Sequence, residues 1–315
     1  MKPRPSRHSG APDTVTVPHF GTRLAERVAA RESQIVLGLD PDPARLWPQA
    51  LAAAPADGTP ADRAAAAVAA HCAAVIAAAG PACVAIKPQL ACFERLGAPG
   101  WAALMQTCAS AQEAGLLVLA DGKRGDIDVS AAAYGQALAG TTSTPFGDVH
   151  GLGADAFTVN PYMGRDTLEV LATSARRSGG GIFVLVRTSN PGAADVEDLE
   201  VTSGGTVAER VAAIVGGLGA DGPLSDVGAV VGATQPEHIG RLRELMPTTP
   251  FLLPGVGAQG GRVEDLGPAF APGRAGGLVT ASRSIVRAHE DGGDDPAEAA
   301  RREAERLRHV AWHLA

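Results

Sequence analysis

LLVLADGKRGDIDVSAAAYGQALA, residues 116–139, contains an apolar run, a charged cluster and a helical pattern in that order. The first five residues are continuously apolar, as expected for a strand of a parallel sheet that is buried on both faces. Asp121, Lys123 and Asp126 follow within six residues, and residues 130–139 have the pattern of a helix. The stretch therefore predicts one strand-to-helix unit with charged side chains at the carboxyl end of its strand.

The same alternation of short apolar runs and helical patterns continues outward from this stretch, from about residue 34 toward the C-terminus. Eight strands that alternate with helices indicate a parallel sheet. The expected strands are Ile35–Leu39, Cys83–Ile86, Leu116–Ala120, Ala156–Val159, Ile182–Val186, Val227–Val231, Phe251–Leu253 and Gly277–Val279. The expected helices are Thr22–Ala30, 62–79, 101–114, 130–139, 166–177, 205–217, 236–246, 262–270 and Pro296–His309.

A closed barrel and an open doubly wound sheet both satisfy this alternation, and the polar residues favour the barrel. Barrels of this class place their active sites at the carboxyl ends of strands from many strand-to-helix units. Polar or turn-forming residues follow several of the expected strands, namely Asp40, Lys87, Asp121, Arg187 and Pro254-Gly255. We therefore expect an α/β fold, a (β/α)8 TIM barrel, as a single domain over residues 21–315, preceded by a disordered tail over residues 1–20.

The composition excludes several classes of partner. With 27 Lys and Arg against 34 Asp and Glu, the formal net charge of −7 argues against a nucleic-acid surface, although a local pocket of cations can still bind a small anion. Four cysteines without metal-ligand spacing and an N-terminus without an apolar signal segment indicate a cytoplasmic protein. The alanine-rich run 64–86 is interrupted by His71 and Gly80-Pro81, so we expect a helix leading into a strand and no membrane partner.

The charged cluster after the strand at 116–120 is the first candidate site. In an extended chain Asp121 and Lys123 point to the same side, because the side-chain period is two. Lys87 and Asp40 end two other strands, so they can reach the same barrel mouth. Charges gathered there are costly unless they are paired, and an alternating Asp–Lys–Asp array pairs them. The alternative is a solvated salt bridge in a loop, which contributes little.

A second candidate site lies near the C-terminus. PGVGAQGG, residues 254–261, follows a strand and is expected to precede a helix, and its glycines expose backbone N–H groups that can hold a phosphate. Arg283 follows the next strand and has a fork-shaped guanidinium suited to a dianion. By our count these are the loops after strands seven and eight, where barrels often bind phosphate. A plain glycine-rich turn is the alternative.

Asp121-Gly-Lys123-Arg-Gly-Asp126-Ile127 resembles the signature of the orotidine 5'-phosphate decarboxylase family, and its context, with Ser130 three residues later, resembles the longer-chain bacterial subfamily. The resemblance extends over roughly residues 34–290. Further similar segments, in order along the chain, are GLDPDP (38–43), AIKPQLACFE (85–94), VRTSNPGA (186–193), PGVGAQGG (254–261) and ASRSI (281–285).

The resemblance implies a catalytic array that converts orotidine 5'-phosphate to UMP in pyrimidine biosynthesis, without metal or cofactor. Lys123 would protonate C6 of the pyrimidine after carbon dioxide leaves, and Asp121 would lie against the substrate carboxylate. Lys87 and Asp126 would complete the array and contact ribose, with Asp126 reaching in from the partner subunit of a homodimer with shared active sites.

The resemblance also implies a set of substrate-binding residues. Asp40 would bind ribose hydroxyls, with Ser130 of the other protomer nearby. Ser189 would hydrogen-bond the pyrimidine, and Gln259 would bridge base and phosphate. Arg283, with N–H groups of the glycine-rich loop, would hold the phosphate.

Two rival interpretations remain. Keto-sugar-phosphate decarboxylases and hexulose-phosphate synthases share the D-x-K-x-x-D skeleton but bind magnesium; the KRGDI context, Ser189 and Gln259 favour the pyrimidine enzyme. A non-catalytic phosphate-binding barrel would keep Arg283 and the glycine-rich loop but would not need the Asp–Lys array. Residues 141–153 have no assigned role.

Overall fold

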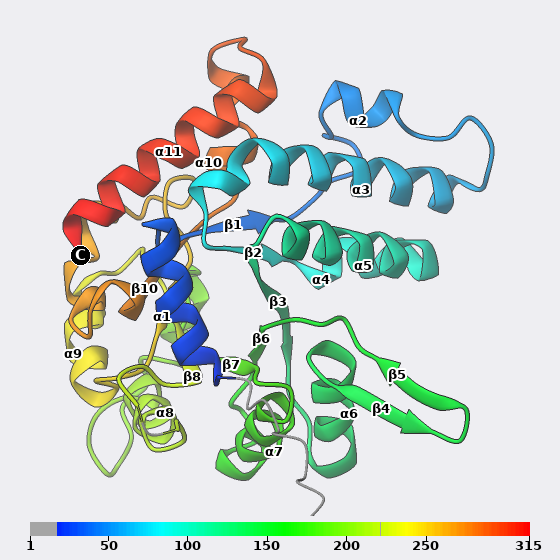
Figure 1. The fold of residues 1–315 in the computed structure, drawn as a ribbon. Helices are drawn as coiled ribbons and strands as arrows, with labels where there is room; N and C mark the ends of the chain where they lie inside the picture. The colour runs from blue at the N-terminus through cyan, green and yellow to red at the C-terminus, as the bar shows by residue number, and fades with distance from the viewer. Residues whose placement is uncertain (1–17, 221) are drawn as a thin grey trace, which may run out of the picture.

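Eight parallel strands close into a barrel in this computed structural model, which describes residues 18–220 and 222–315 (Figure 1). The strand order around the barrel is β1-β10-β9-β8-β7-β6-β3-β2. The strands are β1 (Ile35–Leu39), β2 (Ala85–Pro88), β3 (Leu117–Arg124), β6 (Ala156–Val159), β7 (Gly181–Arg187), β8 (Val227–Val231), β9 (Phe251–Leu253) and β10 (Gly277–Ala281). The predicted (β/α)8 barrel is confirmed, and each expected strand overlaps an observed one.

Helices follow the strands and form an outer layer (Figure 1). The longer helices are α1 (Phe20–Arg31), α3 (Pro60–Ala79), α5 (Gly97–Glu113), α6 (Asp128–Leu138), α7 (Arg165–Arg176), α8 (Val207–Gly216), α9 (Glu237–Leu245) and α11 (Pro296–Leu314). Short helices are α2 (Pro48–Ala52), α4 (Leu90–Glu94) and α10 (Arg283–Val286). Two helices begin with a capping box, on Thr59 before α3 and on Thr206 before α8.

The strands separate two apolar cores, because successive side chains point to opposite faces of a strand. Val36, Leu252 and Leu278 lie in a cluster inside the barrel, together with Phe20 and Leu24 of α1. Their strand neighbours, such as Leu37, Leu253 and Val279, belong to the larger cluster between barrel and outer helices. Helix α1 therefore packs against the barrel interior, and its Phe20 ring meets Phe183 of β7 edge to face at 5.8 Å.

Helix α3 is the one described segment that is long and apolar enough to cross a membrane, with a mean hydropathy of 1.7 over Pro60–Ala82. Of that window, 56% is buried inside the molecule, where α3 packs against α5 and α11. Val68, Cys72 and Val75 of α3 are fully buried in the outer core. The apolar character of α3 is thus used in packing against its neighbours.

One expected helix is wrong. Residues 262–270 form two 3₁₀ turns, Val263–Asp265 and Gly267–Phe270, instead of an α-helix. Pro268 cannot donate a backbone hydrogen bond, and glycine at 267 costs helix stability, so a continuous α-helical ladder is interrupted there. The glycine-rich loop after β9 is therefore followed by short turns.

The disordered tail expected over residues 1–20 lies only partly within the residues that the structure describes. Residues 1–17 lie outside them. Phe20, which the expected tail includes, is the first residue of α1 and is fully buried. Helix α1 therefore includes residue 20, which the predicted boundary assigned to the tail.

Residues 141–150 form an antiparallel hairpin that the sequence analysis did not assign. Its strands are β4 (Thr141–Thr144) and β5 (Gly147–His150), paired from Thr141 to His150 and from Thr144 to Gly147. The hairpin lies beside α6 and extends away from the barrel (Figure 1). Both of its faces are largely exposed, and Phe146 at its tip is 100% exposed.

Candidate functional site

The strand ends of the barrel enclose a cavity of about 500 Å³, within the range of about 300–1,000 Å³ typical of ligand pockets. Its apolar floor is formed by Leu185, Val230 and Leu252 from β7, β8 and β9. Above this floor the side chains are polar. Six of the nine residues predicted for the site line this one cavity, namely Asp40, Lys87, Asp121, Lys123, Ser189 and Gln259.

Strand geometry explains why these side chains meet. Leu117 and Leu119 of β3 point into the barrel, so the period of two also directs Asp121 inward. Ala85 of β2 and Ala156 of β6 are inward residues as well, which places Lys87 and Thr158 two residues later at the mouth. Position on the inner face together with position at a strand end therefore selects the polar lining.

Asp121 is the centre of a buried hydrogen-bonded network. Its Oδ2 accepts from Lys87 Nζ at 2.6 Å and from Gln89 Nε2 at 3.2 Å. Its Oδ1 accepts from Lys123 Nζ at 2.7 Å and from Thr158 Oγ1 at 2.8 Å. One carboxylate is thus held between two ammonium groups, whereas Asp126, the second carboxylate of the expected Asp–Lys–Asp array, accepts from the backbone of Ile127 instead.

The two lysines differ in exposure. The side chains of Asp121 and Lys87 are 7% and 9% exposed, whereas that of Lys123 is 44% exposed. Lys87 is therefore fixed behind Asp121, and Lys123 presents its ammonium group to the open cavity. Of the two, Lys123 is placed to act on a bound molecule.

The electrostatic environment keeps both the Asp121 carboxyl group and the Lys87 amino group charged. Burial raises the pKa of the Asp121 carboxyl, but attraction to Lys87 and Lys123 and their hydrogen bonds outweigh it and hold that pKa well below its usual range. Burial lowers the pKa of Lys87, but the carboxylates of Asp121 and Asp40 outweigh it and raise that pKa. Asp121 is therefore ionised and Lys87 protonated at neutral pH.

The backbone at the end of β3 is irregular where the chemistry is concentrated. Pairing with β6 shifts register between Ala120 and Arg124, and Lys123 has φ of 47°, in the left-handed region that a lysine rarely adopts. Lys123 N donates to Thr158 Oγ1 at 2.9 Å, and Asn160 N donates to the Arg124 carbonyl at 2.8 Å. These bonds stabilise the bulge that aims Lys123 at Asp121.

The opposite wall of the cavity comes from the loops after β7 and β9. Ser189 Oγ donates to Gln259 Oε1 at 2.9 Å, so the two residues predicted to contact the pyrimidine are in contact with each other. Gly255 has φ of 103°, and a Cβ built there would lie 3.2 Å from the Ser189 Cβ. Glycine at 255 therefore allows the two loops to approach.

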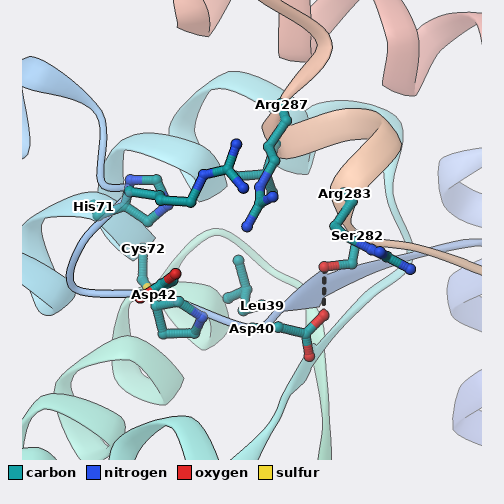
Figure 2. A pocket seen from close by; sticks show the side chains of 11 residues that line it. Leu39, Asp40, Asp42, His71, Cys72, Ser282, Arg283 and Arg287 are labelled. Carbon is teal, nitrogen blue, oxygen red and sulfur yellow. Dashed lines mark hydrogen bonds between the residues drawn. The ribbon is translucent and has the colours of Figure 1, made fainter. Parts of the chain in front are cut away.

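Arg283 lies beside this cavity and does not line it. It lines a smaller neighbouring cavity of about 30 Å³, which shares Asp40 with the larger one. Ser282 Oγ donates to Asp40 Oδ2 at 2.5 Å, as Figure 2 shows. In that view Arg283 lies on the far side of Ser282 from His71, whereas Arg287 points into the small cavity.

Asp126 and Ser130 line neither cavity. Asp126 Oδ1 accepts from the Ile127 backbone N–H at 2.8 Å, and Ser130 lies exposed in the first turn of α6. Within one protomer, the geometry does not bring these two residues to the Asp121 network.

Thr158, Gln89 and Glu197 also line the cavity, although sequence reasoning did not select them. Thr158 is on an inward position at the end of its strand, so the period of two could have found it. Gln89 and Glu197 lie in loops, where periodicity gives no signal. Among the described residues, no three His, Cys, Asp or Glu side chains gather as ligands for a metal ion.

The chain resembles known proteins in both sequence and fold. Residues 33–302 match the family described as "Orotidine 5'-phosphate decarboxylase / HUMPS family". A protein of Deinococcus radiodurans named orotidine 5'-phosphate decarboxylase is 42% identical to this chain, over 85% of this chain and 89% of that protein. A protein of the same name from Rhodopirellula baltica is 41% identical, over 86% of this chain and 89% of that protein. A crystal structure of a proposed orotidine 5'-phosphate decarboxylase from Streptomyces avermitilis has a TM-score of 0.76 at 34% identity, covering 97% of this chain and 99% of that chain.

Proposed function

Because this chain belongs to the orotidine 5'-phosphate decarboxylase family, we propose that its barrel mouth converts orotidine 5'-phosphate to UMP with Lys123 as the proton donor and without metal or cofactor. The chain is an enzyme, a carboxy-lyase of pyrimidine biosynthesis with a nucleotide substrate. The observation that carries the mechanism is the Asp121 carboxylate shared between Lys87 and Lys123.

The chemistry requires a cation beside the reacting carbon. Loss of carbon dioxide from C6 leaves an electron pair in the plane of the pyrimidine ring, where the ring cannot delocalise it. An ammonium group held at that position stabilises the developing charge and then delivers a proton to C6. Lys123 suits this role because it faces the open cavity, while its bond to Asp121 Oδ1 at 2.7 Å fixes its orientation.

Asp121 is assigned to the position against the substrate carboxylate. It stays ionised because its two lysine partners hold its pKa low. Interactions with the remote parts of the nucleotide offset the repulsion between the two carboxylates, and departure of carbon dioxide relieves it. Lys87, buried behind Asp121, keeps the array in place.

The remaining wall provides the nucleotide contacts. Asp40 is assigned to the ribose hydroxyls, the Ser189–Gln259 pair to the pyrimidine and to the bridge between base and phosphate, and Arg283 to the phosphate. The glycine-rich loop turns through φ of 74° at Gly257, and the N–H groups of Gly257, Gly260 and Gly261 donate within the loop, so the N–H groups of the residues between Gly257 and Gly260 are assigned to the phosphate. Arg283 has no ion pair among the described residues, so its charge is available to a ligand.

We further propose a homodimer with shared active sites in which Asp126 and Ser130 serve the partner's site. Their position outside their own protomer's cavity supports this assignment. The exposed apolar side chains of Ile127 and Val129, which flank them, provide surface for a partner to cover. Residues 21–315 are proposed to act as one cytoplasmic domain.

A spectrophotometric assay of orotidine 5'-phosphate loss, with and without excess chelator, tests the proposal. We expect the purified chain to release UMP at the same rate in both conditions. Absence of turnover would contradict the assigned reaction. Loss of activity in chelator that magnesium restores would instead favour the rival metal-dependent enediolate enzymes.

A further inference from the structure

The guanidinium group of Arg187, at the end of β7, has no role in the proposed chemistry. The sequence places Arg187 at a strand end near the barrel mouth, yet its side chain does not line the cavity. Arg187 is 4% exposed and lies behind the loop that carries Ser189. A buried arginine needs several acceptors, so its partners indicate what it holds.

Its partners come from two loops at the mouth. Arg187 Nε and Nη2 donate to Asp198 Oδ1 and Oδ2 at 2.8 and 2.9 Å, in the bidentate geometry of a strong ion pair. Nη1 donates to the Thr188 carbonyl at 2.6 Å and Nη2 donates to Gln235 Oε1. Arg187 therefore ties both ends of the β7 loop, residues 188–198, to the loop after β8.

The same cluster fixes the residue before Ser189. Glu197 lies 3.7 Å from Arg187 Nη1 and accepts from Thr188 N at 2.8 Å and from Thr188 Oγ1 at 3.0 Å. Glu197 and Thr188 both line the cavity. The contacts of Arg187 thus reach the cavity wall through the backbone of Thr188.

Ser189 is then confined on its other sides. Its carbonyl accepts from Thr234 Oγ1 at 3.1 Å, and its Oγ donates to Gln259 at 2.9 Å. A Cβ built on Gly232 would lie 2.8 Å from the Ser189 Cα, which shows how closely the β8 loop approaches. With Arg187 holding the loop from behind, Ser189 is fixed relative to the base-binding wall.

We propose that Arg187 is a positioning residue for pyrimidine recognition, which acts through Ser189 and touches no part of the substrate. This inference rests on the proposed function, in which Ser189 contacts the base. A bidentate pair and two further acceptors in one cluster hold the loop in a single arrangement, so the loop is preorganised before the nucleotide binds. The assigned ribose contact of Asp40 and the assigned phosphate contact of Arg283 follow other strands, β1 and β10, and do not depend on Arg187.

The first test compares ligands with and without a base. Arg187→Met should raise the Kd of UMP at least tenfold while leaving the Kd of ribose 5-phosphate within twofold. Arg176→Met is the matched control, because Arg176 also makes a bidentate ion pair, with Asp226, away from the cavity. That variant should lower the melting temperature without changing the ratio of the two Kd values. Equal weakening of both ligands by Arg187→Met would overturn the proposal.

A double-mutant cycle with Ser189→Ala supplies the second readout. If Arg187 acts through Ser189, the double variant should bind UMP within twofold of Ser189→Ala alone. Multiplying effects of the two changes would overturn the proposal and leave the role of Ser189 intact. No effect of Ser189→Ala on UMP binding would overturn both. Should Arg187→Met fail to fold, Asp198→Asn weakens the same Arg187–Asp198 ion pair at its partly exposed partner. Asp198→Asn must then weaken UMP binding while leaving ribose 5-phosphate binding unchanged.

Discussion

Asp121 and Lys123 lie two residues apart in one short motif and form an ion pair with each other. The period of two predicts that Asp121 and Lys123 share one side of the chain, and the 2.7 Å bond between them agrees. The left-handed conformation of Lys123 could not be predicted, because it depends on the register shift against β6 and on Thr158. The sequence therefore identifies the pair, and tertiary contacts set its geometry.

At the same scale, Arg283→Ala should weaken binding of UMP and of the substrate. Removing a charged hydrogen-bond donor costs roughly 1.5–3 kcal/mol, a loss of about 10- to 100-fold in affinity. Added guanidinium ion should restore part of the activity, because it replaces the missing cation. Arg287→Ala, which removes the arginine directed into the small cavity, should have a much smaller effect on UMP binding.

The nucleoside that lacks the phosphate provides the control for Arg283. Its turnover should be nearly the same in the wild type and in Arg283→Ala. If the nucleoside lost as much rate as the nucleotide, Arg283 would not be the phosphate ligand.

His71 gives a pH dependence of folding. Burial and the neighbouring His289 lower the pKa of His71 to about 4, and its Nδ1 accepts from the Trp47 backbone N–H at 3.1 Å. Because the unfolded chain binds the proton more tightly, stability falls as the pH drops from the ordinary histidine pKa toward the folded value. Protonation of His71 should lower the free energy of unfolding by about 2 kcal/mol between pH 7 and pH 5.

Denaturant unfolding of the wild type and of His71→Gln at both pH values measures this effect. The variant should be less sensitive to the change from pH 7 to pH 5. An equal loss of stability in both proteins would contradict the role assigned to His71.

At the scale of elements, the strands were predictable because each is a short apolar run, buried on both faces. The helix expected over 262–270 failed because its apolar residues suited a helix, whereas Gly267 and Pro268 permit only turns. The hairpin 141–150 was missed because exposure of both faces removes the apolar alternation that identifies a strand. Burial thus produces the pattern that sequence reasoning detects.

Arg243 of α9 hydrogen-bonds to several neighbouring segments of the chain and holds them together. Its buried guanidinium donates to the carbonyls of Met246, Thr249, Ala269 and Gly276 and lies 3.7 Å from the centre of the Phe251 ring. These bonds join α9 to β9 and to the turns that precede β10. Replacing it leaves buried carbonyls without donors, at about 1–3 kcal/mol for each unsatisfied group.

We therefore expect Arg243→Met to lower the free energy of unfolding by several kcal/mol. Arg241→Ala is the matched control on the same helix, since Arg241 is 55% exposed and its ion pairs with Glu209 and Glu244 contribute at most about 1 kcal/mol. Denaturant titration measures both. Similar losses of unfolding free energy in the two variants would contradict the structural role assigned to Arg243.

At the scale of the whole molecule, barrel closure gathers residues that are far apart in the chain. Asp40 and Gln259 are brought to one cavity because parallel strands end at the same rim. Strand-end positions predicted this much. The sequence could not show that the Arg187 side chain turns away from the cavity, because a bulge after Leu185 alters the side-chain direction there.

The shared-site homodimer predicts complementation between defective subunits. Mixing Lys123→Ala with Asp126→Ala protein under exchange should place both defects in one site of each mixed dimer and leave the other site intact. Random pairing makes half of the dimers mixed, so about a quarter of wild-type activity should return. If both residues served the same protomer's site, mixing would restore nothing.

Lys123, held by Asp121, is the proposed proton donor to the pyrimidine after decarboxylation. Turnover of orotidine 5'-phosphate by Lys123→Ala, with UMP binding measured on the same preparation, tests it most directly. A group that stabilises a developing anion and also supplies the proton should be worth more than about 10²-fold in kcat. We predict a loss beyond that factor while UMP still binds; a variant that retains kcat within about tenfold of the wild type would contradict the account.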